Sequence, residues 1–339
     1  MGGRFEAPVY VRSCAVYLPA LRIKRQEYVK SLGTFSAPGV DEKAVADFDE
    51  DAVTMAVEAA RAALEAAAGG GSVGGDVGGL YLASTTLPYA EKVQASTLRE
   101  ALGLNAGVFC CECTTSARAG TEALVCAARQ VALERGAVLV VSSEAPWADP
   151  CEAAEHALGA GAAALVLAPQ GWARLLGWYS FASESLGMRF RPTGSLNPQD
   201  LELRDYAQSA LRTAVVEAVN GITVLLGETL ERFKLVILPQ LDARTPVQLA
   251  RMLGLRAEQV NPAVVAARWG DLGSAGPFAA LVAAVPVLEC GDKVLLVCWG
   301  SGQAADAVAL EVTSSPVVAV PSEGFSYIAF TDHLRRRVS

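Results

Sequence analysis

Residues 110–121 read Cys-Cys-Glu-Cys-Thr-Thr-Ser-Ala-Arg-Ala-Gly-Thr. They lie between an apolar strand predicted over 106–110 and a small-residue helix predicted to run to about Arg135. A helix that starts at such a turn presents unpaired N–H groups and a positive dipole end, which would activate a thiol and hold an anion. The residue at the first turn is Ala117, which has no reactive group. The stretch therefore predicts the strand–turn–helix geometry of a reactive site, but it lacks the side chain that would react.

Composition limits the class of protein. The chain has 339 residues, 52% of them apolar, which is enough for one large domain or two halves of roughly 150 to 170 residues each. Its net charge of −8 argues against a nucleic-acid partner, and we interpret the basic run at 335–337 as a solvated tail. Residues 1–6 lack the apolar core expected of a signal peptide, and no uninterrupted apolar run reaches the roughly 18 residues that a membrane span needs. We expect a cytoplasmic protein.

The eight cysteines do not predict a metal site. Cys14, Cys290 and Cys298 lie in apolar stretches and are typical of reduced core thiols. The cluster at 110–113 has no second cysteine pair at zinc spacing, and the chain has only two histidines. We therefore expect no metal, and we interpret the cluster as core or dimer-interface packing.

Apolar strands alternate with helices along the chain, which predicts an α/β layered fold. Strands are predicted over 9–21, 79–84, 106–110, 137–142, 158–167, 175–183, 234–238, 293–298 and 307–312. Helices are predicted over 25–32, 49–64, 96–102, 117–135, 203–233, 246–253 and 275–288. Loops are predicted at 69–75 and 188–198. The second half repeats the order of the first, so we predict a duplication with halves 1–169 and 170–339.

Several stretches carry a family resemblance, in the same order and over nearly the whole chain. They are 39–45, 49–60, 119–123, 159–165, 295–302 and 327–336. Together they resemble the archaeal-type 3-hydroxy-3-methylglutaryl-CoA synthases. The resemblance implies the thiolase fold, a duplicated five-layer αβαβα arrangement. It also implies acyl-CoA as the substrate and no cofactor bound by this chain.

The resemblance assigns four catalytic positions, and this chain has lost the reactive group at each. The cysteine that takes the acyl group corresponds to Ala117, and the histidine corresponds to Pro239. The asparagine corresponds to Asp271, and the glutamate that deprotonates the acetyl carbon corresponds to Thr85. An alanine cannot form a thioester, and a proline cannot transfer a proton.

A closer resemblance is to the non-catalytic synthase-like subunits of phloroglucinol acetyltransferase-type complexes, on residues 87–89 and 270–275. It implies a degenerate, non-catalytic subunit that assembles with a thiolase-like catalytic subunit and a small OB-fold protein with a zinc ribbon. It also implies a homo- or heterodimer through the thiolase-fold interface. The alternative is a diverged acyltransferase or carbon–carbon condensing or cleaving enzyme that works without the usual cysteine, histidine and asparagine.

Four residues are candidates for a remaining pocket, each with a structural alternative. Ser116 is a displaced nucleophile or a capping serine. Asp242 and Asp271 are an acid/base pair or turn formers. His156 lies at the edge of the acyl pocket that the resemblance implies, or it is structural.

Overall fold

The computed structural model describes residues 1–69, 74–185, 189–200, 203–320 and 324–338. Within them, the main sheet has the strand order β10-β11-β12-β9-β2-β8-β7-β5-β6, with β1 attached to β9 and β13 attached to β2. A second, small sheet has the order β14-β3-β4. The strands are β1 Gly2–Gly3, β2 Tyr10–Tyr17, β3 Leu21–Lys24, β4 Glu42–Val45, β5 Val77–Ala83, β6 Phe109–Cys113, β7 Ala137–Glu144, β8 Gly161–Ala168, β9 Ala173–Ala182, β10 Leu235–Ile237, β11 Lys293–Gly300, β12 Ala304–Val312, β13 Val318–Ala319 and β14 Ser326–Tyr327.

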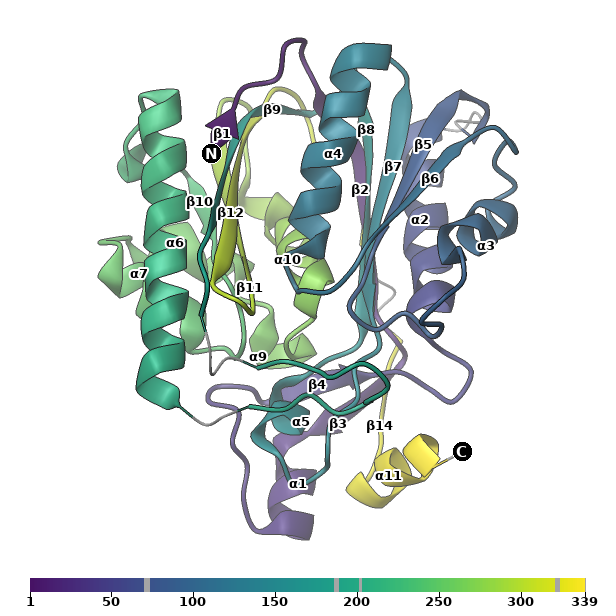
Figure 1. Cartoon of the computed structure of the whole chain (residues 1–339), viewed down its shortest axis with the longest axis vertical. Helices are drawn as coiled ribbons and strands as arrows, with labels where there is room; N and C mark the ends of the chain where they lie inside the picture. Colours follow the sequence, from purple (N-terminus) through teal and green to yellow (C-terminus); the bar gives the residue numbers. More distant parts are fainter. Residues whose placement is uncertain (70–73, 186–188, 201–202, 321–323, 339) are drawn as a thin grey trace.

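Helices cover both faces of the main sheet and fill the space inside its curve (Figure 1). They are α1 Arg25–Leu32, α2 Ala52–Ala68, α3 Gln94–Ala101, α4 Ala119–Glu134, α5 Ala153–Ala157, α6 Arg204–Leu226, α7 Thr245–Met252, α8 Ala257–Val260, α9 Ala266–Trp269, α10 Gly276–Ala284 and α11 Phe330–Val338.

The two parts of the main sheet repeat one pairing pattern. In the first, β5 runs parallel to β7, and antiparallel pairs β7–β8 and β8–β2 follow. In the second, β10 runs parallel to β11, and antiparallel pairs β11–β12 and β12–β9 follow. This repetition supports the predicted duplication. The boundary near Pro169, in the turn between β8 and β9, stays a prediction.

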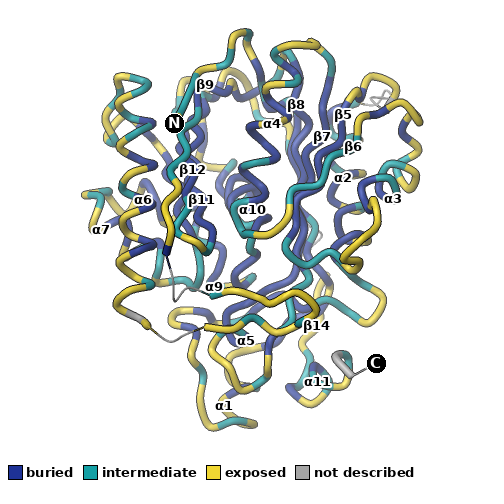
Figure 2. The backbone as a smooth tube through the Cα atoms, viewed as in Figure 1, coloured by how far each residue is buried: buried dark blue, intermediate teal, exposed yellow. Residues whose placement is uncertain are grey.

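Five layers follow from where the helices pack. The apolar faces of α4 and α10 meet between the two parts of the sheet, in the largest core cluster of the described residues. α2 covers the outer face of β2, β7 and β8, and α6 covers the outer face of β9, β11 and β12. Figure 1 shows the layers from α6 across the sheet and the central helices to α2, and Figure 2 shows that the central strands and helices are the buried part.

Below these layers, the small sheet packs with α1, α5 and α11 (Figure 1). Its core is built from residues of both chain ends, including Leu21, Tyr28 and Phe330. The C-terminal helix α11 therefore packs against β3 and α1, which lie near the start of the chain.

Two strand predictions are wrong in their bounds. The predicted strand 9–21 is two strands, β2 and β3, because Pro19 interrupts the ladder and β3 joins the small sheet. The strand before α4 is β6 at Phe109–Cys113 rather than 106–110. Cys111 and Cys113 therefore lie within the strand, on the face that packs against the central layer.

Other predicted segments need smaller corrections. The helix predicted over 203–233 ends at Leu226, where Gly227 takes a left-handed conformation. Cys290 is exposed in the turn before β11, so it is not a core thiol. Residues 70–73 of the predicted glycine loop and 188 of the predicted irregular segment lie outside the described residues.

Candidate functional site

The turn between β6 and α4 carries Ala117, just before the N-cap residue Arg118. Cys298 of β11 donates from its Sγ to the Ala117 carbonyl at 3.3 Å. Burial raises the pKa of the Cys298 thiol to about 12. Because the thiolate is the nucleophile, this protonated, buried thiol does not replace the missing cysteine.

Arg118 ties the start of α4 to the second half of the chain. Its Nη1 donates to Asp306 Oδ1 at 3.0 Å and to Ser180 Oγ at 3.1 Å. Thr121 Oγ1 donates to the other Asp306 oxygen at 2.8 Å. The start of α4, which would hold an anion in an active enzyme, is thus hydrogen-bonded to side chains of β12 and β9.

Thr85, at the position assigned to the glutamate, donates hydrogen bonds to a carboxylate from another strand. Glu144, at the end of β7, accepts five hydrogen bonds from the loop after β5 and from the turn before α10. The donors are Thr85 N at 3.0 Å, Thr85 Oγ1 at 2.8 Å, Thr86 Oγ1 at 2.9 Å, Ser274 N at 3.3 Å and Ser274 Oγ at 2.5 Å. A carboxylate has about four lone-pair sites, so Glu144 is saturated by protein donors.

Asp271, at the position assigned to the asparagine, is buried at the contact between the two halves. Its N–H donates to the Ala157 carbonyl at 2.7 Å, and its carbonyl accepts from Gly159 N at 2.9 Å. Oδ1 accepts from Gly273 N at 2.9 Å, and Oδ2 lies 3.7 Å from a guanidinium nitrogen of Arg189. Burial raises the pKa of this carboxyl above its ordinary value of 3.8.

Pro239 and Asp242 follow β10. Between them, Gln240 Oε1 accepts the N–H groups of Val265 and Ala266 at 2.9 and 3.0 Å. Asp242 Oδ1 accepts three hydrogen bonds from Arg244 and Thr245, in the turn that leads into α7. The charge of Asp242 is a minor cause of the raised pKa of Asp271, after burial, and the acid/base pair stays a prediction.

Ser116 and His156 lie in different surroundings. Ser116 Oγ accepts from Arg118 N at 3.2 Å and packs tightly against Gly300, which fits a turn serine. His156 Nδ1 accepts from Ser36 N at 2.8 Å, and its ring stacks on Phe35 at 5.1 Å. Burial lowers the pKa of His156, so it is held neutral. His156 therefore packs against the segment that follows α1, whereas Ser116 lies in the turn before α4, next to Ala117.

Two features were not predicted from the sequence. One is Glu144, whose only signal is its place at the end of the strand predicted over 137–142. The other is a buried cluster in which Lys43 Nζ, Tyr28 Oη and His333 Nε2 all lie within 2.9 Å of Glu155 Oε1. Its members are spread from residue 28 to residue 333, so no local pattern could have found them.

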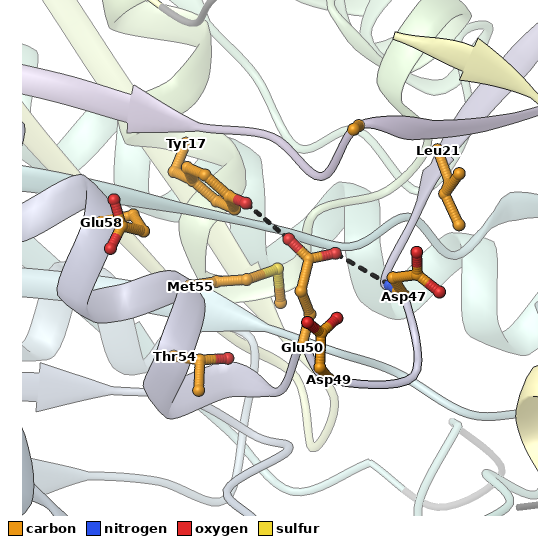
Figure 3. A pocket seen from close by; sticks show the side chains of 9 residues that line it. Tyr17, Leu21, Asp47, Asp49, Glu50, Thr54, Met55 and Glu58 are labelled. Atoms are coloured by element: carbon orange, nitrogen blue, oxygen red, sulfur yellow. Dashed lines mark hydrogen bonds between the residues drawn. The ribbon is translucent and has the colours of Figure 1, made fainter.

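Two cavities open near the small sheet. The first has a volume of about 360 Å³ and is lined by acidic side chains around Tyr17. Figure 3 shows Tyr17 Oη donating to Glu50, which also accepts from the backbone of Asp47. The second, of about 180 Å³, shares Asp47 and Glu50 with the first and reaches under α11. Neither includes Ala117, Pro239 or Asp271 in its lining.

Two questions about the described residues are whether any group could hold a metal ion and whether any helix could cross a membrane. They contain no group of three or more histidine, cysteine, aspartate or glutamate side chains that could hold a metal ion. Helix α6 is long and apolar enough to cross a membrane by length and composition. Here it packs against β9 and β12, which accounts for its apolar face.

No protein-family model matches the chain, whereas curated proteins resemble it over most of its length. It is 32% identical over 314 residues to hydroxymethylglutaryl-CoA synthase of Pyrobaculum aerophilum, covering 90% of this chain and 88% of the relative. It is 30% identical over 337 residues to the synthase of Archaeoglobus fulgidus, covering 95% of this chain and 96% of the relative.

Solved structures match the fold. MvaS in complex with 3-hydroxy-3-methylglutaryl coenzyme A superposes with a TM-score of 0.83 at 18% identity, covering 98% of this chain and 92% of that one. The 3-oxoacyl-(acyl carrier protein) synthase III of Pseudomonas aeruginosa PAO1 gives a TM-score of 0.80 at 20% identity, covering 91% and 99%. The predicted α/β thiolase fold is confirmed.

Proposed function

Because this chain belongs to the hydroxymethylglutaryl-CoA synthase family, we propose that it is a degenerate, non-catalytic subunit of an acyl-CoA acyltransferase or thiolase-type complex. The observation that carries the proposal is the set Ala117, Pro239, Asp271 and Thr85. These residues stand at the four positions where the family resemblance assigns reacting groups. Family membership itself implies acyl-CoA chemistry, with no cofactor bound by the chain.

The surroundings of these positions support a structural role. The Cys298 thiol that donates to the Ala117 carbonyl is protonated, and the carboxylate beside Thr85 already accepts five protein hydrogen bonds. A general base needs an open lone pair within hydrogen-bond reach of the proton it removes. Glu144 therefore ties Thr85 and Ser274 together and is not placed to serve as a base.

The exposed edge of β6 is the surface that we assign to a thiolase-fold partner. Phe109 is 57% exposed and the rest of the strand is half-buried, whereas the opposite edge strand, β10, is fully buried. The charge of Glu112 is turned inward to the N–H groups of Gln94 and Ala95. An uncharged, open edge strand is suited to pairing with another chain.

The proposed partners are a thiolase-like catalytic subunit and a small OB-fold protein with a zinc ribbon. The proposed location is the cytoplasm, and neither nucleic acid nor membrane is a partner. These assignments rest on the resemblance to synthase-like complex subunits. The chain contributes shape and contacts, and the partner contributes the nucleophile.

Acyl-CoA turnover by the purified chain, alone and with its thiolase-like partner, tests the proposal. We expect turnover only with the partner, and we expect it to be lost when the partner's nucleophile is replaced. Phe109→Lys, at a 57% exposed site on the open edge, should weaken assembly. The matched change Val224→Lys, at an 81% exposed site on α6, should leave assembly unchanged.

A diverged enzyme that works without the usual reacting groups predicts the opposite result. The chain alone would then turn over acyl-CoA, and Ser116→Ala or Asp271→Ala would abolish that activity. Either finding would reject the non-catalytic role.

A further inference from the structure

The cavity under the C-terminal helix is built from parts of the chain that are far apart in sequence. Its walls come from β4 and the residues after it, the loop after β7, the approach to β8, and α11. The apolar residues among them are Ala44, Val45, Ala46, Phe48, Ala145, Pro146, Trp147, Leu158 and Ala160. Only the folded chain, with α11 docked, assembles this space.

The charged groups around the cavity are already paired within the protein. Lys43 Nζ and His333 Nε2 each lie 2.7 Å from Glu155 Oε1. Arg336 Nε donates to Asp47 Oδ1 at 2.8 Å. Glu50 accepts from Tyr17 Oη and from the backbone of Asp47 (Figure 3). A charged ligand would enter without a counter-charge, and burying such a charge is costly.

The size of the cavity limits the ligand. Its volume is about 180 Å³. An engineered apolar cavity of about 150 Å³ is large enough to take benzene. A small number of polar groups among mostly apolar walls is the usual character of a small-molecule site.

We propose that this cavity binds a neutral, largely apolar molecule or group of about six carbons, in the size range of benzene. Helix α11 supplies His333 and Arg336 to the wall and is held by Phe330 and by the contacts of those two residues. Occupancy of the cavity therefore stabilises the docked helix. This inference is independent of the proposed complex, because it concerns a cavity that does not include Ala117.

The test uses the full chain and cyclohexanone as a neutral probe, with hexanoate as its charged counterpart. Isothermal titration measures binding, and hydrogen exchange measures protection of residues 330–338. Ala46→Leu fills the cavity from a half-buried position, and Ala62→Leu makes the same change at a half-buried position on α2 outside it. Should Ala46→Leu fail to fold, Ala145→Leu fills the same space.

We expect saturable cyclohexanone binding and slower exchange in α11 for the wild type and Ala62→Leu. The cavity-filling variant should lose roughly tenfold or more in affinity, and hexanoate should bind more weakly than cyclohexanone. Absence of saturable cyclohexanone binding to the wild type would overturn the inference. Unchanged affinity in the cavity-filling variant, or preferred binding of hexanoate, would overturn it equally.

Discussion

At the scale of single residues, the groups around Ala117 and Thr85 are bound within the protein and are not free to react. Ala117 faces a thiol that burial keeps protonated, and Thr85 is held by a carboxylate from β7. Restoring one group does not restore a mechanism, because a nucleophile needs an adjacent base and an oriented substrate.

Ala117→Cys is therefore expected to remain unacylated by acetyl-CoA. The family resemblance assigns the histidine to the position of Pro239, and a general base contributes about 10²- to 10⁴-fold to rate. Mass spectrometry of the intact chain checks this, with the double variant Ala117→Cys, Pro239→His as the comparison. Acetylation of the single variant at the rate of the double one would contradict the expectation.

Asp271→Asn is expected to raise stability at neutral pH. Burial disfavours the charged form, so the folded-state pKa of Asp271 is raised above 3.8. A carboxyl with a raised pKa costs nothing below the unfolded value, and its cost grows as pH rises through the folded value. The gain in unfolding free energy from Asp271→Asn should therefore be larger near neutral pH, at about 7.5, than in acid, at about 4.5.

Urea denaturation at the two pH values measures the difference. Asp76→Asn, at an exposed position, is the control and should show no such trend. A gain that is equal at both pH values would show that charge burial is not its cause.

At the scale of elements, close packing around α4 holds the site in place. A Cβ on Gly120 would lie 2.3 Å from the Ser274 carbonyl oxygen, in the turn before α10. Ser274 is the same residue that binds Glu144, so α4, β7 and the turn before α10 pack as one unit.

Gly120→Ala is expected to cost about 2 kcal/mol of unfolding free energy, because the backbone of the facing turn must shift. Gly136→Ala is the matched control, since nothing lies within 4 Å of its added Cβ. Thermal or chemical denaturation measures both. Equal stabilities of the two variants would contradict the close packing.

At the scale of the whole molecule, the two halves are joined by buried polar contacts as well as by the shared apolar layer. Arg118 from the first half meets Asp306 and Ser180 from the second. The side chain of Asp306 is 6% exposed, so it would stay buried without its partner.

Arg118→Met is expected to cost about 3 kcal/mol of unfolding free energy, because it leaves the Asp306 carboxylate buried and less well paired. The comparison is Arg61→Met, which breaks an exposed pair with Glu58 and should cost at most about 0.5 kcal/mol. Calorimetry measures the loss of stability in both variants. An equally small loss in the two would show that the Arg118 contact is no stronger than a surface ion pair.

The fold was accessible from the sequence, because alternating apolar strands and helices are local patterns. The four catalytic positions came from the family resemblance and stay a prediction. The exact bounds of β6 and the break at Pro19 were missed, because pairing with neighbouring strands decides where a strand starts and ends.

What the sequence determined was the α/β layering, since this depends on residue type and order. What only the tertiary structure decided was which polar groups meet. Glu144 with Thr85 and Ser274, and Lys43 with Glu155 and His333, come together across up to 290 positions, the separation of residues 43 and 333. No local pattern carries such contacts, because the low-dielectric core forces distant polar groups to pair only once the chain has folded.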